Sequence, residues 1–180
     1  MKYLYTPFDV ALYIWTSNLT ITQEYFVIDS LWERRDTEIW HLYSKDKKTF
    51  VNSMYHELYI MEGYLGNADE LNLIFQEMGS KFNVGETNFE QGVIESYFKL
   101  IKLKLTYTPN IDYCKIKLRN LIGRFGYKRR TKSLVECIER TTNALGLKVY
   151  LRGWEYCNIA TVALDDMIII RGKNTVFFRE

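Results

Sequence analysis

The most constraining feature of this sequence is a pair of amphipathic segments joined by a short basic turn, within LRNLIGRFGYKRRTKSLVECIERTTNALGLKVYL at residues 118–151. The first segment predicts a helix, because its apolar residues recur with the spacing of one helix face at Leu118, Leu121, Ile122 and Phe125. The second segment has a similar apolar face between Leu134 and Leu145. The stretch therefore predicts two short helices around a tight turn.

Both helices carry recognisable end signals. Gly126 and Gly146 each follow the last apolar residue of a helix, at the position where glycine ends helices. Thr131 and Ser133 are both candidates to begin the second helix, and Ser133 with Glu136 matches a capping box. The basic residues of FGYKRRTKS (125–133) are thus expected on a short, constrained turn.

From about residue 88 the patterns follow the order helix, short strand, helix, tight turn, helix, strand, loop, strand. The strands are expected at 112–116, 148–151, 167–171 and 175–178. This is the element order of a winged helix-turn-helix, in which three short helices share one core covered by a small sheet. An arbitrary α+β domain with the same order is the alternative.

The N-terminal part is predicted to be strand-rich and then helical. Aromatic and β-branched runs predict strands at 10–15, 24–28 and 38–43. Helices are expected over 51–65, over 67–82 and from Thr87 onward, the last with a conversion to strand at 101–105 left open. We therefore predict an α+β chain with an acidic N-terminal α+β part over 1–86, serving structure or association, and a winged-helix-like basic domain over 87–180.

The two ends of the chain differ in charge. Residues 1–110 hold 10 Lys and Arg against 15 Asp and Glu, whereas residues 111–180 hold 14 against 7. Such asymmetry indicates polyanion binding by the basic half. No apolar run approaches the roughly 20 residues of a membrane helix, and the N-terminus is a poor signal peptide. We expect a cytoplasmic protein with no membrane partner.

The segment 118–151 also resembles a known module. Many bacterial proteins, several of them tied to restriction and other defence systems, contain an apolar pair, Phe-Gly, two residues, an Arg pair, a helix, and Gly-Leu entering an extended segment. The matching positions here are Leu121, Ile122, Phe125, Gly126, Arg129, Arg130, Ile138, Gly146 and Leu147, with Asp166-Met167-Ile168 as a strand entry. The resemblance implies a winged-helix-like accessory module, although the usual Pro after Gly-Leu is missing, and it does not extend to the N-terminal part.

The basic residues around the turn are the candidate nucleic-acid contacts. In a winged helix the second and third helices face the DNA, a helix start offers free N–H groups to phosphate, and Arg binds phosphate or guanine bidentately. The candidates are Arg124, Lys128, Arg129, Arg130, Lys132, Arg140 and Arg152. Glu136 and Glu139 argue against this reading, since carboxylates repel phosphate and a mixed face is also typical of an ordinary solvated helix.

Catalytic and metal signatures are incomplete. His56-Glu57 begins like a zinc-protease motif, but Ile60 stands where the second His would be. Asp165-Asp166 before IIIRGK hints at an Mg²⁺ nuclease, yet Arg171 occupies the place of the further carboxylate, so a turn is the better reading. Three widely spaced cysteines suggest neither a disulfide framework nor a zinc site. We expect no enzyme activity, no cofactor and no metal.

The sequence thus predicts a non-enzymatic nucleic-acid-binding protein, with duplex DNA as the first expectation. Its Lys, Ile, Asn and Tyr usage suggests a low-GC bacterium or its mobile elements, where it would act as a regulator or defence-linked accessory. The alternative is a phage-encoded inhibitor that binds a host defence protein of the CRISPR or restriction type through protein–protein contacts. DNA against RNA, and self-association, are left open.

Overall fold

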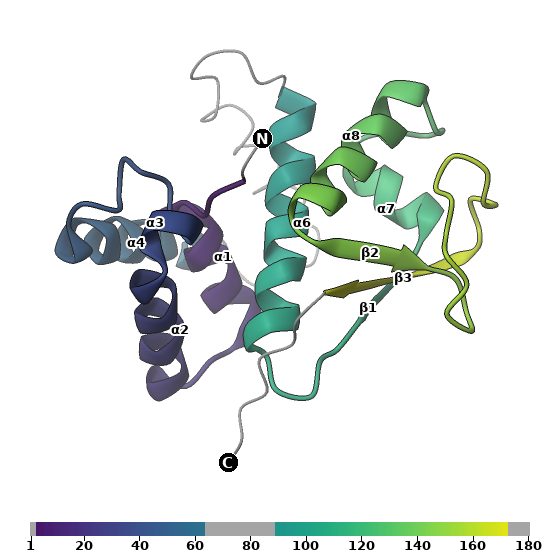
Figure 1. Cartoon of the computed structure of the whole chain (residues 1–180). Helices are drawn as coiled ribbons and strands as arrows, with labels where there is room; N and C mark the ends of the chain where they lie inside the picture. Colours follow the sequence, from purple (N-terminus) through teal and green to yellow (C-terminus); the bar gives the residue numbers. More distant parts are fainter. Residues whose placement is uncertain (1–2, 64–88, 173–180) are drawn as a thin grey trace. The chain divides into compact units, whose positions relative to one another are not determined.

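The computed structural model describes residues 3–63 and 89–172 (Figure 1). The chain divides into two compact units, Met1–Ile74 and Phe75–Glu180. Helices and one antiparallel sheet make the chain an α+β protein, as the sequence predicts. The predicted boundary at 86/87, the predicted helix over 67–82 and the predicted strand over 175–178 lie outside the described residues. Within the described ranges, no helix has both the length and the apolar character needed to cross a membrane.

The described part of the first unit is helical. Its elements are α1 (Pro7–Ser17), α2 (Ile21–Glu33), α3 (Arg35–Glu38) and α4 (Lys47–Glu62). The strands predicted at 10–15 and 24–28 were wrong, because these residues lie in α1 and α2. The strand predicted at 38–43 was also wrong, since only a single parallel bridge from Tyr5 to Ile39 forms there and turns follow. The helix predicted over 51–65 is confirmed as far as Glu62.

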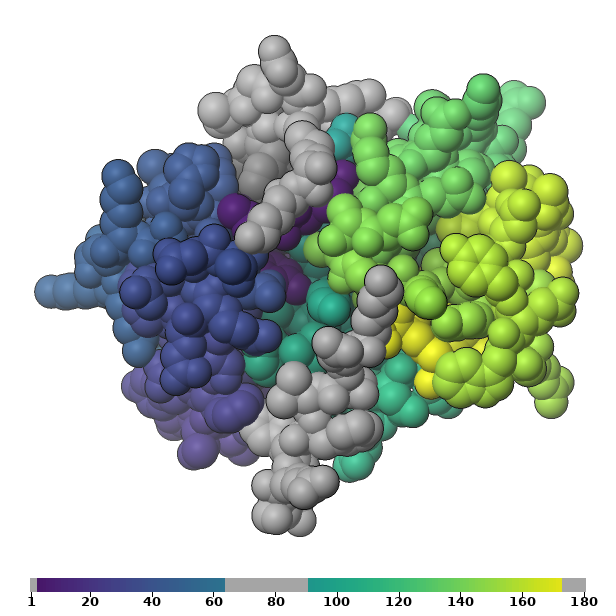
Figure 2. Space-filling model, viewed as in Figure 1, coloured from purple at the N-terminus to yellow at the C-terminus, as the bar shows by residue number. Residues whose placement is uncertain are grey.

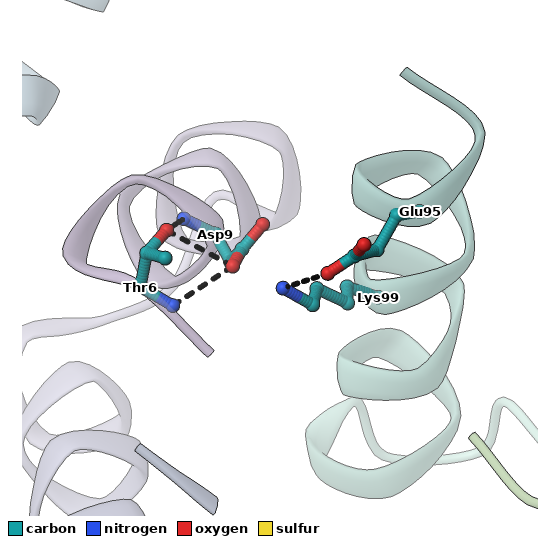
Figure 3. Close-up of polar contacts among 4 residues, drawn as sticks. All are labelled: Thr6, Asp9, Glu95 and Lys99. Atoms are coloured by element: carbon teal, nitrogen blue, oxygen red, sulfur yellow. Dashed lines mark hydrogen bonds and ion pairs between the residues drawn. The ribbon is translucent and has the colours of Figure 1, made fainter. Parts of the chain in front are cut away.

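Local hydrogen bonds explain why the aromatic runs become helices. Thr6 begins α1 by donating its N–H to Asp9 Oδ2 over 2.8 Å and accepting the Asp9 N–H at its hydroxyl over 3.4 Å (Figure 3). Pro7 follows at the first helical position, where its missing N–H costs nothing. Residues 10–13 are fully buried, so α1 shows no amphipathic period and its sequence looks like a strand.

The second unit contains three helices and three strands in its described residues. They are α6 (Phe89–Tyr107), β1 (Cys114–Lys117), α7 (Leu118–Arg124), α8 (Lys132–Ala144), β2 (Leu147–Tyr150) and β3 (Met167–Gly172). The strands predicted at 112–116, 148–151 and 167–171 are confirmed to within about two residues. The conversion to strand at 101–105, which the sequence left open, does not occur, because α6 continues through these residues. The predicted start of that helix at Thr87 lies outside the described residues.

Burial of α6 explains the alternation that resembles a strand. Ile101, Leu103, Leu105 and Tyr107 are all buried, so apolar residues occupy more than one face of this helix. The buried ammonium of Lys99 pairs with Glu95 one turn earlier on the same helix at 2.7 Å (Figure 3). The helix therefore supplies a counter-charge for its own buried cation.

The sheet has the strand order β1-β3-β2, with both pairs antiparallel. Residues 151–166 connect β2 to β3, and we call them the β2–β3 loop. Ile116, Val149, Ile168 and Ile170 are buried in the core that the strands share with α6, α7 and α8. Figure 1 shows these three helices beside the sheet. Because side chains alternate along a strand, the intervening residues form the outer face of the sheet.

Candidate nucleic-acid interface

The turn between α7 and α8 begins with a fully bonded helix end. Gly126 has φ +83°, its N–H donates to Gly123 O over 3.0 Å, and the Tyr127 N–H donates to Ile122 O over 3.0 Å. This is the Schellman motif, which requires a left-handed residue at the glycine position. The helix stop predicted at Gly126 is confirmed. Phe125 is buried just before it, with its ring centroid 5.5 Å from that of Tyr97.

The end of the turn is set by Thr131, which caps α8. Its side-chain oxygen accepts the Leu134 N–H over 3.2 Å. The alternative start at Ser133, with the Ser133–Glu136 capping box, was wrong, because Ser133 lies inside the first turn of α8 and a helix has one N-cap. Glu136 instead pairs with the exposed ammonium of Lys132 at 3.8 Å. The turn is therefore fixed by backbone hydrogen bonds at the end of α7 and by the Thr131 side-chain cap at the start of α8.

Arg130 joins this turn to the β2–β3 loop. Its Nη1 donates to Ile159 O over 2.7 Å and to Val162 O over 2.6 Å. Ile159 and Val162 have buried side chains, and Arg130 is itself partly buried. The sequence suggested a phosphate contact for Arg130, but the structure gives this guanidinium a structural role, which no local pattern reveals because its acceptors lie 29 and 32 residues away.

Three of the predicted contacts are left with exposed, unneutralised charge. Lys128 and Arg129 lie on the turn and Arg152 lies at the start of the β2–β3 loop, all of them exposed. Within residues 3–63 and 89–172, no carboxylate forms an ion pair with these three. Figure 2 shows the loop, in yellow-green to yellow, at the surface of its unit. The structure thus places Lys128 and Arg129 on a hydrogen-bonded turn that Arg130 links to the loop.

The remaining candidates lie on the helices beside the turn. The Arg124 guanidinium lies 5.8 Å from the Tyr97 ring centroid at the end of α7. Lys132 projects from the first turn of α8 with 92 % of its side chain exposed, although Glu136 is its neighbour. Arg140 lies two turns further along α8, 3.9 Å from Cys137 Sγ. Glu136 and Glu139 are exposed on the same helix, so the face of α8 is mixed, as its sequence predicts.

The far end of the β2–β3 loop is fastened to α7. Arg119 Nε and Nη2 donate to the two carboxylate oxygens of Asp165 over 2.7 and 2.9 Å. These hydrogen bonds hold the pKa of Asp165 below its usual range. Leu118 N–H also donates to Asp166 O over 3.1 Å, in keeping with a turn at Asp165-Asp166. Among the described residues, no group of three His, Cys, Asp or Glu side chains is placed to hold a metal ion.

A second basic surface escaped the sequence reasoning. On the outer face of the sheet, the Arg171 guanidinium lies 4.0 Å from the Trp154 ring centroid and 5.0 Å from that of Tyr113. Lys115 Nζ lies 5.3 Å from the same Tyr113 ring. The sequence does contain a signal for this surface, because Lys and Tyr alternate along the strands. Alternation within one strand does not show which residues of different strands share a face, and that requires the register of the three strands.

No protein-family model matches this chain, no curated protein matches it, and no solved structure matches it. The resemblance of residues 118–151 to a bacterial accessory module stays a prediction. What the chain binds has to be inferred from its own residues.

Proposed function

We propose that residues 89–172 form a winged-helix module that binds nucleic acid without catalysis, with α7 and α8 as the helix-turn-helix and the β2–β3 loop as the wing. Support comes from the element order, helix, strand, two helices and a hairpin, and from the sheet order β1-β3-β2. The observation that carries the proposal is the linkage of turn to wing by Arg130, beside the exposed Lys128 and Arg129.

In this proposal the turn positions the protein on the phosphate backbone. Lys128 and Arg129 bind phosphate, and the first N–H groups of α8 point toward the same region. A turn whose ends are already hydrogen-bonded favours binding, because little backbone freedom has to be lost when phosphate arrives. Arg152, at the start of the wing, provides a further contact to the backbone.

The mixed face of α8 suits base reading better than phosphate binding. Arg140 can donate to guanine and Asn143 to adenine, and a glutamate such as Glu139 can accept from the amino group of cytosine in the major groove. The carboxylates that would weaken a plain phosphate site are thus compatible with a helix that reads duplex DNA. The protein would act as a regulator or defence-linked accessory of a bacterium or its mobile elements.

The test is a salt titration of binding to duplex DNA, followed by fluorescence anisotropy. We expect Lys128→Ala/Arg129→Ala to weaken binding about 2- to 30-fold, because two solvent-exposed charge contacts of about 0.2–1 kcal/mol each are lost. The slope of log affinity against log salt should fall by about 2. Lys45→Ala/Lys48→Ala removes the same charge from exposed sites in the first unit and is the matched control. No duplex binding at low salt, or equal loss in the control, would overturn the proposal.

A second candidate function, binding of a protein partner, is favoured by an aromatic surface in the first unit. Ile21 and Tyr25 are exposed on α2, and Tyr55 and Tyr59 are exposed on α4. Asp29 and Lys47 join the two helices through an ion pair of 2.6 Å. Exposed aromatic side chains of this kind are enriched at protein interfaces.

Under this alternative the protein inhibits a nucleic-acid-binding defence protein of its host. The acidic character of the first unit complements a basic nucleic-acid-binding partner. Tyr25→Ala/Tyr59→Ala should then abolish co-purification with one such partner, whereas Lys128→Ala/Arg129→Ala should leave it intact. The reverse pattern would favour the nucleic-acid proposal.

A further inference from the structure

We propose that the outer face of the three-stranded sheet is a second binding site, for single-stranded nucleic acid, whose bases stack on Trp154 and Tyr113 while lysines of the strands bind the phosphates. The site is separate from the α7–α8 turn, and it does not depend on duplex binding there. Its evidence is the register of the strands, the ring–guanidinium contacts, a small pocket and the backbone at Trp154.

The register places cations and rings in rows across the sheet. Lys115 of β1 lies opposite Ile169 of β3, which lies opposite Tyr150 of β2. Arg171 of β3 lies opposite Lys148 of β2, and Lys117 of β1 lies opposite Met167 of β3. Directly opposite residues in an antiparallel pair share one face, so these side chains form a single basic surface with an apolar centre.

Three rings and one guanidinium already contact one another on this surface. The guanidinium of Arg171 lies within 4.0 Å of the Trp154 centroid and 5.0 Å of the Tyr113 centroid. The Trp154 and Tyr150 rings meet edge to face at 5.8 Å. Trp154 nevertheless leaves 66 % of its surface exposed, so ring area remains available. Base stacking on such rings is sequence-tolerant, because every base has a π face.

A pocket of about 240 Å³ lies between these groups, with Tyr113, Lys115, Tyr150, Trp154, Ile169 and Arg171 in its wall. The rings and the aliphatic side chain of Ile169 suit a nucleobase, and the cations suit its adjoining phosphate. Duplex DNA keeps its bases stacked inside the helix and cannot present them here, whereas a single strand can.

The backbone holds Trp154 in an unusual conformation. Gly153 has φ +86° and Trp154 has φ +70°, so two consecutive left-handed residues turn the chain. The Leu151 N–H donates to Glu155 O over 2.7 Å, which closes this turn. A bulky residue in the left-handed region costs about 1–2 kcal/mol, and such strain is concentrated at functional sites. The strain is consistent with a ring presented for binding.

The charges around the pocket favour an anionic ligand. Lys115, Lys117 and Lys148 are exposed on the strands. Asp112 Oδ2 lies 3.6 Å from Arg171 Nη1 and neutralises part of that charge, and Glu155 is exposed on the loop beyond Trp154. The balance on the strands remains positive, as expected for a groove that follows a phosphate backbone.

The test measures anisotropy of labelled twelve-nucleotide oligo-dT and oligo-U, with a twelve-base-pair duplex beside them. Trp154→Gly removes the ring and keeps a residue that accepts the left-handed backbone. We expect it to weaken single-strand binding about 5- to 150-fold, the range for one stacked base, and to leave duplex binding unchanged. Trp40→Ala, which removes an exposed tryptophan ring of the first unit that belongs to neither proposed surface, is the matched control and should change neither.

Lys115→Ala provides a second variant whose folding is not at issue, because its side chain is exposed on an outer strand. It should weaken single-strand binding and lower its salt slope by about 1. A photo-activated 5-iodouracil strand should cross-link to the tryptic peptide 153–171, or to the peptide that contains Tyr113. Wild-type protein that binds neither oligonucleotide, or Trp154→Gly and Trp40→Ala variants that bind them equally, would overturn the inference while leaving the duplex proposal to its own test.

Discussion

The α7–α8 turn and the outer face of the sheet are both basic, but they hold their charge in different ways. On the turn, Lys128 and Arg129 extend from a backbone fixed by Gly126 and Thr131. On the sheet, Lys115 and Arg171 each lie within 5.3 Å of a ring centroid. Charge alone suits the phosphates of a duplex, whereas charge beside exposed rings suits unpaired bases. The difference predicts two ligand preferences within one unit.

Among the variants that test this comparison, Arg130→Ala is expected to have the largest effect on stability. It removes two charge-assisted hydrogen bonds to Ile159 O and Val162 O, each worth about 1.5–3 kcal/mol, so the free energy of unfolding of the second unit should fall by about 3–6 kcal/mol. Duplex affinity should fall with it, because the turn and the loop are no longer linked. Chemical denaturation measures the first effect and anisotropy the second.

Arg130→Lys is the matched control, since it keeps the charge but cannot reproduce the same guanidinium geometry. If the lysine variant matches wild type in stability and in duplex binding, Arg130 acts through its charge alone. The geometry of the guanidinium would then not be what holds the turn, and the fixed turn would no longer distinguish this surface from the outer face of the sheet.

Gly126→Ala tests whether the turn is held by its backbone. The left-handed φ of +83° at this position should make alanine unfavourable by about 1–2 kcal/mol. Space is not the cause, because a Cβ here meets no described atom within 4 Å. Gly123→Ala, in the helix and equally open, should be neutral or stabilising. Thermal melts of the two variants give the comparison, and equal melting temperatures would contradict the helix-stop assignment.

Thr131→Ala tests the other end of the turn with a smaller effect. Loss of the cap should lower stability by about 0.5–2 kcal/mol, whereas Ser133→Ala should change it by no more than about 0.5 kcal/mol. Single-strand binding at the sheet should be the same in both variants. If urea denaturation showed a larger loss of stability for Ser133→Ala than for Thr131→Ala, Ser133 would be the N-cap of α8, as the capping box in the sequence suggested.

The smallest effect concerns pH and the Arg119–Asp165 pair. Arg119 lowers the pKa of Asp165, so the pair stabilises the fold above the ordinary carboxyl pKa of 3.8 and loses this contribution as the pH falls through the lowered value. The difference in melting temperature between wild type and Asp165→Asn should therefore be small, constant from pH 5 to 7, and absent at the acidic end of a melting series. If the difference in melting temperature grew as the pH fell, the Arg119–Asp165 pair would not stabilise the fold through a lowered pKa of Asp165.

The second unit was predictable because its elements are marked locally. Gly126 and Gly146 end the helices, and the apolar faces of α7 and α8 have clear helical spacing. In the first unit, α1 is buried on all sides, so its periodic signal vanished, although Thr6, Pro7 and Asp9 carried the cap signal that would have identified it. Capping residues, glycine helix stops and helical spacing therefore identified helices more reliably than aromatic composition did.

The candidate site was only partly accessible from sequence. The exposed cations Lys128, Arg129 and Arg152 could be chosen from charge and position alone. The role of Arg130 depends on carbonyl groups in a distant loop, and the outer face depends on strand register and on the left-handed backbone at Trp154. Such tertiary relations leave no pattern in a single sequence.

The most direct test of the two-surface account is the ratio of single-strand to duplex affinity in two variants measured side by side at one salt concentration. Lys128→Ala/Arg129→Ala should raise this ratio, because it weakens duplex binding alone. Trp154→Gly should lower it, because it weakens single-strand binding alone. Movement of the ratio in opposite directions is the predicted result, and a parallel loss of both affinities in both variants would contradict two separate surfaces.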